Sequence, residues 1–245
     1  MVMASTAQKV SEPPAVQGNA TEPSLINTTG AVMNDPSLPA EDVTVDAKNF
    51  NHYFDMHGTA TDRLNSDGSV TITLTKKGQQ YSAGGISLKE KINMDSSFTL
   101  NGQINLGNFG GADGMGIVFH TGSVDALGRP GGNLGIAGLP DAVGFKLDSY
   151  YDYYNEPTSS LPGDQIPLPQ NGEDDSKYGQ SQDPTMAVPC GDIVTTSHEQ
   201  VTTTTGKKAW RWWVNNQDGT VQPLTTSLMD GRFHDFQMQY NGQTH

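Results

Sequence analysis

Apolar and polar residues alternate along most of the chain from about residue 49 onward, with the two-residue period of a β-strand. Residues 69–75, Ser-Val-Thr-Ile-Thr-Leu-Thr, show this alternation most clearly. The same signal predicts further strands at 86–88, 97–106, 116–120, 142–148, 209–214 and 234–240. No segment carries the i, i+3, i+4, i+7 apolar repeat of an amphipathic helix. The pattern therefore predicts an all-β fold, a sandwich or jelly roll of antiparallel sheets.

Two segments interrupt this pattern. Residues 1–45 contain five prolines among Ser, Thr, Asn and Glu and no aromatic residue, which is typical of a linker or an extended N-terminal arm. Residues 46–245 are then long enough to form one β-sandwich domain. Within this domain, residues 152–200 hold six prolines and an acidic cluster at 173–175, and they are expected to form a long irregular loop.

Composition narrows the choice of partners. The formal net charge is −13 and the chain has no run of Lys or Arg, so nucleic acid and anionic membrane are poor partners, whereas a cation or a neutral ligand fits better. Cys190 is the single cysteine, which rules out a disulfide or a thiolate zinc site built within the chain. The sequence has no apolar run of the ~18 to 20 residues that span a bilayer, so this segment is not expected to insert into a membrane.

Three motifs carry candidate chemistry. Asp148 and Asp152 leave a predicted strand four residues apart, and with an intervening carbonyl they can supply half of a calcium shell. Asp113 lies between a glycine-rich turn and an apolar strand, and the glycines of residues 131–135 let backbone N–H groups approach a ligand closely. Each motif by itself is more typical of an ordinary turn than of a binding site.

The order and spacing of these motifs are more specific than any one of them. The segments 112–120 (ADGMGIVFH), 131–135 (GGNLG) and 143–150 (VGFKLDSY) closely resemble the L-type lectins, nearest to the branch found in serine-rich-repeat and related cell-wall adhesins of Gram-positive bacteria. The resemblance covers about residues 46–245. It implies a legume-lectin-type jelly-roll β-sandwich, truncated at its C-terminal end, that acts as a monomeric module of a larger secreted or cell-surface adhesin. The expected partners are host or microbial glycans and glycoproteins, and the expected cofactor is Ca²⁺.

The resemblance also implies roles for individual residues. Asp113 is expected to accept hydrogen bonds from two sugar hydroxyls, and Gly132 to donate its N–H to the sugar beside Asn133. In the family the peptide bond before this aspartate, here Ala112–Asp113, is cis. A cis peptide of this kind costs roughly 3 to 4 kcal/mol, so neighbouring groups must stabilise it, and the calcium shell is expected to do so. The calcium shell itself is expected to consist of Asp148, the Tyr150 carbonyl, Asp152 and one later aspartate.

The last calcium ligand has two candidates. Asp183 is preferred because proline follows it, as is typical of the family, and Asp164 is the rival. The chain departs from the family at Lys146, where plant members carry a glutamate that binds a second metal ion. Lys146 and Asp148 share one face of a strand, so the ammonium is expected to replace that ion and leave a single-metal site. Asp152 stands where many relatives have asparagine, and an ionised carboxylate cannot donate a hydrogen bond to the sugar.

Two alternative functions compete with a lectin. A structural spacer domain of an adhesin stalk would bind calcium only for rigidity. A β-sandwich glycoside hydrolase would need paired carboxylates across the scissile bond, of which the strand-borne E-x-D-x-x-E run is the familiar form. That run is missing from the sequence, so the protein is not expected to be an enzyme. Trp210, Trp212 and Trp213 could form a sugar platform, but strand alternation places at least one of them in the core.

Overall fold

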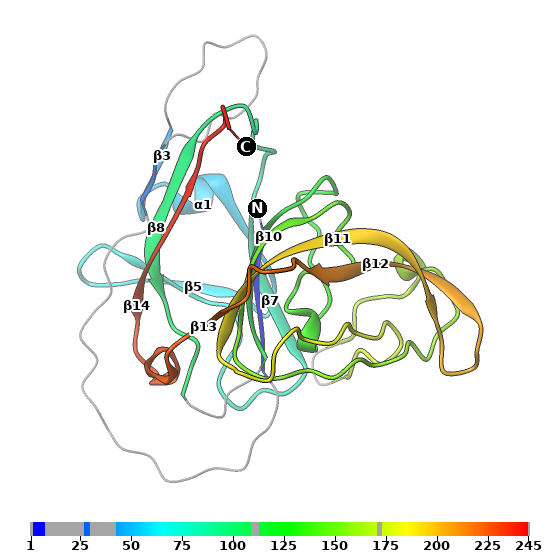
Figure 1. Ribbon diagram of the computed structural model, residues 1–245. Coiled ribbons are helices and arrows are strands. Elements are labelled where there is room, and N and C mark those ends of the chain that lie inside the picture. The colour runs from blue at the N-terminus through cyan, green and yellow to red at the C-terminus, as the bar shows by residue number, and fades with distance from the viewer. Residues whose placement is uncertain (1, 8–26, 30–42, 109–112, 171–172, 245) are drawn as a thin grey trace.

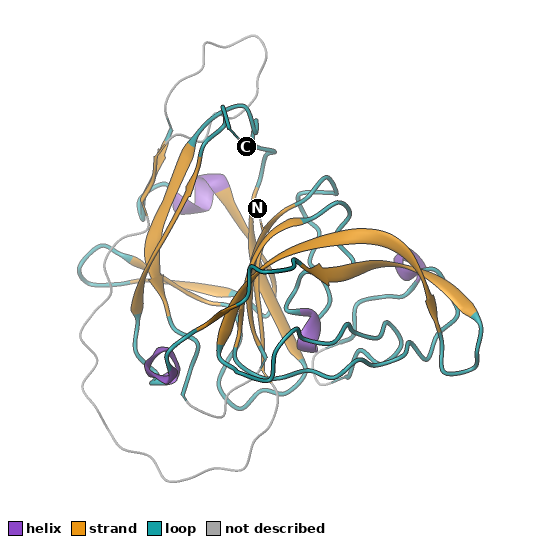
Figure 2. Ribbon diagram, viewed as in Figure 1, coloured by secondary structure: helices purple, strands orange, loops and turns teal. Residues whose placement is uncertain are grey.

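The computed structural model describes residues 2–7, 27–29, 43–108, 113–170 and 173–244. β-strands and loops make up nearly all of this part of the chain (Figure 2). Helix is confined there to α1 (Phe50–Tyr53) and to three 3-10 segments, η1 (Gly131–Asn133), η2 (Gly163–Gln165) and η3 (Thr226–Met229). None of these helices has the length and apolar character needed to span a membrane. The prediction of an all-β fold is confirmed.

The larger sheet is antiparallel and has the strand order β12-β11-β10-β9-β1-β7-β4, with β13 pairing to β11 (Figure 1). Its strands are β1 (Val2–Ala7), β4 (Phe54–Gly58), β7 (Ser82–Leu88), β9 (Gly114–Phe119), β10 (Val143–Asp148), β11 (Cys190–Thr202), β12 (Lys208–Asn216) and β13 (Gln222–Pro223). Strands β9 and β10 are neighbours, and Gly114, which follows Asp113, pairs with Asp148, so two of the three motifs of the sequence meet where β9 begins and β10 ends.

A second antiparallel sheet has the order β14-β8-β2-β3, formed by β2 (Asn27–Thr29), β3 (Thr44–Val45), β8 (Phe98–Ile104) and β14 (His234–Tyr240). A separate hairpin joins β5 (Thr61–Leu64) to β6 (Val70–Thr73). The core between the two main sheets includes Ile117 and Leu147 from the larger sheet and Phe236 from the smaller one. The domain is thus a sandwich of two antiparallel sheets.

Residues 146–148 of β10 are buried, and successive side chains of this strand point in turn to the core and to the candidate site. Leu147 packs into the core between the sheets. Lys146 and Asp148 lie on the opposite face, because successive side chains of a strand point to opposite sides. That face is shared by the cross-strand neighbours Gly116 and Gly114 of β9, and a Cβ on Gly116 would meet Ile136 at 2.6 Å. The loops around residues 130–140 therefore pack closely over the face that carries Lys146 and Asp148.

The N-terminal segment differs from the linker or arm expected for residues 1–45. Strand β1 lies inside the larger sheet, paired with β7 on one side and β9 on the other. Strand β2 pairs with β8 in the smaller sheet. Strands of this kind are specified by pairing with neighbours, to which composition is a poor guide. Residues 8–26 and 30–42 of the expected arm lie outside the described residues.

The long loop expected over 152–200 ends earlier, because β11 begins at Cys190. The sequence signal failed here because polar residues take buried positions in this strand. The buried Thr196 hydroxyl donates to the carbonyl of Leu139 at 2.7 Å and accepts the N–H of Ala142 at 2.8 Å. Since these hydrogen bonds replace apolar contacts, β11 lacks a clean apolar alternation.

Candidate functional site

Asp113 and Asp148 meet where β9 begins and β10 ends. Gly114 is the cross-strand partner of Asp148, and a Cβ on Gly114 would lie 2.1 Å from the carbonyl oxygen of Leu147. Gly114 also has a φ of +148°, so both its conformation and its surroundings require glycine. The N–H and the hydroxyl of Ser149 both donate to the carbonyl of Asp113, at 2.9 and 3.0 Å. The backbone at Asp113 is therefore fixed to the start of the loop that follows β10.

Asp148, Asp152 and Asp183 converge on one buried point. Each offers a carboxylate oxygen, and these oxygens lie within 4.8 Å of one another. The N–H of Asp152 donates to Oδ2 of Asp183 at 2.6 Å, and the N–H of Asp183 donates to the carbonyl of Asp152 at 3.0 Å. These reciprocal bonds bring together two residues that are 31 positions apart. Asp164, the rival of Asp183, lies in η2 and is not a member of this group.

The three carboxylates fit a hard divalent cation. Calcium binds oxygen at about 2.3 to 2.6 Å, so two oxygens on one ion lie at most roughly 5 Å apart, which is compatible with this cluster. Oδ2 of Asp152 is buried and accepts no hydrogen bond from the described residues. Buried polar atoms of this kind usually have a partner. An all-oxygen set of ligands suits calcium better than zinc or copper.

Lys146 supplies a positive charge on the other side of this cluster. Its Nζ lies 2.6 Å from Oδ1 of Asp183 and makes an ion-pair contact of 3.0 Å with Oδ2 of Asp148. Burial alone would lower the pKa of Lys146, but the charges of Asp148 and Asp183 outweigh burial and the pKa is raised. The ammonium is therefore charged and neutralises part of the acidic cluster.

The remaining negative charge is costly without a cation. The pKa of Asp152 is raised to about 7, mainly by burial and then by the nearby carboxylates of Asp113 and Asp183, against the opposing effect of the Gln180 hydrogen bond. Burial also raises the pKa of Asp148, against the opposing effect of Lys146. A bound divalent cation would favour the ionised form of both groups. A bound cation would thus relieve the repulsion among these buried carboxylates, which Lys146 alone does not fully compensate.

Gly132 and Asn133 lie against the same cluster, within η1. A Cβ on Gly132 would come within 2.4 Å of Cγ and Oδ2 of Asp152, so the glycine backbone packs directly on that carboxylate. The buried amide of Asn133 donates to the carbonyl of Gly179 at 2.9 Å. The structure therefore brings the 131–133 segment, Asp152 and the end of the long loop to one place.

Gln180 belongs to this group, although the sequence did not single it out. Its Nε2 donates to Oδ1 of Asp152 at 3.0 Å and to the carbonyl of Tyr153 at 3.2 Å. Its backbone pairs with Asn155 through two hydrogen bonds of 3.1 Å. A glutamine 28 residues beyond Asp152, inside an irregular loop, gives no sequence signal of this role.

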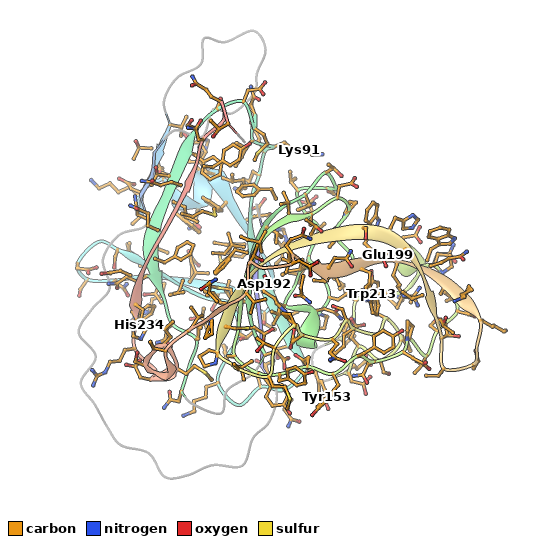
Figure 3. All side chains as sticks on the ribbon, in the orientation of Figure 1. Lys91, Tyr153, Asp192, Glu199, Trp213 and His234 are labelled. Carbon is orange, nitrogen blue, oxygen red and sulfur yellow. The ribbon has the colours of Figure 1, made fainter. Side chains whose placement is uncertain are left out.

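Tyrosines form the outer rim of the loop. Tyr150, Tyr153 and Tyr154 are exposed, and the rings of Tyr151 and Tyr153 meet edge to face at 4.9 Å. Tyr153 lies at the periphery of the molecule in Figure 3, whereas the labelled Trp213 lies farther inside. Trp213 is buried and Trp210 is exposed, in agreement with the expected alternation of the strand.

Asp113 is buried, with a relative exposure of 2%. Its carboxylate is close enough to Asp152 to raise the pKa of Asp152. The peptide bond expected to be cis, Ala112–Asp113, involves a residue outside the described part of the chain.

Replacing Gly132 by alanine tests the packing of this segment on Asp152. The added methyl group would overlap the carboxylate and displace it, so we expect the calcium dissociation constant to rise about tenfold or more, as for other changes that misplace a ligand. Isothermal titration calorimetry would measure it. Gly122→Ala is a matched control. The Cβ added there would lie 2.9 Å from the ring of Pro140, which is not part of the cluster. Equal calcium affinity in both variants would contradict the prediction.

Comparison with known proteins shows the family of this domain. The model of the legume lectin β-barrel domain family matches residues 45–245. The chain is 30% identical over 224 residues to the "Serine-rich adhesin for platelets" of Staphylococcus aureus strain USA300, and equally to that of strain MRSA252. The alignment covers 89% of this chain but only 9% and 15% of those relatives, so the chain corresponds to a small part of their length. On the strength of the match over residues 45–245, the chain belongs to the L-type lectin family.

Proposed function

We propose that this domain binds glycans in a calcium-dependent manner, as the recognition module of a bacterial surface adhesin. The observation that carries the proposal is the convergence of Asp148, Asp152 and Asp183 within 4.8 Å, directly beside Asp113. The L-type lectin domain and the similarity to an adhesin point to a binding protein rather than an enzyme.

Each residue has a distinct part in the proposed site. Asp148, Asp152 and Asp183 hold one calcium ion, together with the carbonyl of Tyr150. Lys146 neutralises the charge that remains, since the charges of three carboxylates, one calcium ion and one ammonium sum to zero. The ammonium thereby excludes a second metal ion. Asp113 accepts hydrogen bonds from the sugar, Gly132 and Asn133 border it, and Tyr150 offers an aromatic face to the apolar side of a pyranose ring.

Asp152 also borders the sugar in this proposal, but as a hydrogen-bond acceptor only. The amide of Gln180 lies against its carboxylate, but its two N–H groups donate to Asp152 and to the carbonyl of Tyr153, so it does not replace the donor that an asparagine would supply to the sugar. We therefore expect the sugar specificity of this domain to differ from that of relatives with asparagine at this position.

The adhesin role extends the proposal to partners and location. By analogy with the staphylococcal adhesins, the domain would be displayed on the surface of a Gram-positive bacterium or secreted, and would meet host or microbial glycoproteins. Single shallow sites bind sugars weakly, and multivalent display compensates for this weakness.

A glycan array tests the proposal most broadly. The domain should be displayed multivalently and probed in millimolar Ca²⁺, after chelation, and after calcium is restored. We expect binding to a restricted set of glycans that disappears on chelation and returns with calcium. Glycan binding that survives chelation would contradict the role of calcium. Calcium binding with no glycan signal would instead favour a structural spacer of an adhesin stalk.

A further inference from the structure

Two buried arginines lie beneath the irregular segment between Asp152 and Asp183. Arg211 of β12 has no exposed surface, and Arg129 precedes η1. All five N–H groups of the Arg211 guanidinium donate to backbone carbonyls, at 2.6 to 3.2 Å, on Ser159, Leu161, Lys177, Tyr178 and Trp210. A buried guanidinium is costly unless its donors are satisfied, and here the acceptors come almost entirely from one loop.

Arg129 holds the middle of the same loop. Its guanidinium donates to the carbonyls of Pro167, Gly163 and Ile166 and makes an ion pair of 3.5 Å with Asp175. The two arginines therefore donate hydrogen bonds to carbonyls at both ends and in the centre of residues 159–178. Apart from η2, the described part of this segment has no helix or strand of its own to satisfy those carbonyls.

Tyr178 connects the two arginines. The guanidinium carbons of Arg129 and Arg211 lie 4.4 and 5.1 Å from the centre of its ring, within the range of cation–π contacts. Its hydroxyl donates to the carbonyl of Trp212 at 2.8 Å, and its ring stacks near Trp213. The buried Tyr178 therefore fixes the end of the loop to β12.

The next two residues of the chain join this assembly to the candidate site. The carbonyl of Gly179 accepts the amide of Asn133, and Gln180 donates to the carboxylate of Asp152. Gly179 has a φ of +84°, and a Cβ there would lie 2.7 Å from the carbonyl of Asn155, so the turn at this point is closely packed. A shift of Tyr178 would be transmitted directly to Gly179 and Gln180.

We propose that Arg129 and Arg211 are positioning residues of the glycan and cation site, and that they keep its outer wall ordered whether or not a cation is bound. The wall is formed by Asn133, Gly179 and Gln180. The arginines contact neither the cation nor the sugar and act through Tyr178 and the loop. The inference rests on the proposed function for the identity of the site, but not for the order of the loop.

Two substitutions test this role. Arg211→Lys and Arg129→Lys keep the positive charge but lose the planar set of donors. Arg232→Lys is the matched control, because the Arg232 side chain is 84% exposed. The calcium dissociation constant, measured by calorimetry, should rise about 10- to 100-fold in the first two variants, as it does when residues that orient metal ligands are lost. The control should equal the wild type.

Hydrogen exchange distinguishes positioning from a general loss of stability. In chelator, the wild-type amides of residues 155–170 and 173–180 should stay protected. Arg211→Lys should expose them to exchange about tenfold faster while β8 and β14 remain protected. Loss of wild-type protection on chelation would show that the cation orders the loop and would overturn the proposal, as would wild-type calcium affinity in both variants.

The proposed function fails separately if the wild type binds no calcium. In that case, unchanged hydrogen exchange in the arginine variants would also overturn the inference. Faster exchange confined to the loop would show that the arginines anchor the loop, but it would refute their role at a cation site. If Arg211→Lys does not fold, Arg129→Lys and the wild-type exchange in chelator decide the question.

Discussion

Replacing Asp113 by asparagine is expected to reduce glycan binding at least about 100-fold. The substitution preserves shape but removes the charge and one acceptor from a residue proposed to hold two sugar hydroxyls, and hydrogen bonds to a charged group contribute about 1.5 to 3 kcal/mol each. Calcium binding should persist, because Asp113 is not among the three carboxylates that converge. Glycan-array intensity and calorimetric calcium titration on the same preparation would measure both effects.

Asp125→Asn is the matched control for this experiment. Asp125 is exposed in the loop after β9, so its substitution removes the same charge away from the site. If Asp113→Asn and Asp125→Asn bound the glycans equally well, Asp113 would have no role in recognition and the spacer function would be favoured.

Replacing Asp183 by asparagine is expected to raise the calcium dissociation constant by about two orders of magnitude and to abolish glycan binding with it. Asp183 supplies a carboxylate to the cluster, accepts the ammonium of Lys146 at 2.6 Å and accepts the N–H of Asp152. Its loss would leave Lys146 with less compensation and would release Asp152. Removing one partner of a buried charge pair commonly costs about 3 to 5 kcal/mol.

Asp164→Asn provides the comparison, because Asp164 is the other aspartate that the sequence allows as last ligand. It is exposed in η2, outside the buried cluster, and its substitution should leave calcium and glycan binding unchanged. A larger effect at Asp164 than at Asp183 would assign the ligands differently from the geometry described above.

Most of the sandwich was accessible from the sequence because strands such as β12 and β14 alternate between more buried and more exposed residues. Residues 234–240 were predicted as a strand and form β14 with the same bounds, and β10 and β12 differ from their predicted ranges by at most two residues. β11 escaped prediction because Thr196 is buried through hydrogen bonds rather than apolar contacts. β1 escaped because pairing with β7 and β9, not its composition, places it in the sheet.

The candidate site was accessible only in part. Local motifs indicated Asp113, Asp148 and Asp152, since these residues flank strands that the alternation located. Strand geometry also placed Lys146 on the face of Asp148, where the structure has it. Gln180, Arg129 and Arg211 were not found, because their roles depend on contacts 28 to 52 residues apart that an irregular loop creates.

We propose that one calcium ion binds Asp148, Asp152 and Asp183 beside Asp113. Anomalous diffraction from a crystal grown in ample Ca²⁺ tests it most directly. The account predicts a single calcium peak bound by the three carboxylates, with Lys146 in contact with Asp148 and Asp183 and no second metal. A cluster without a peak, or a second ion in the place of the Lys146 ammonium, would contradict it.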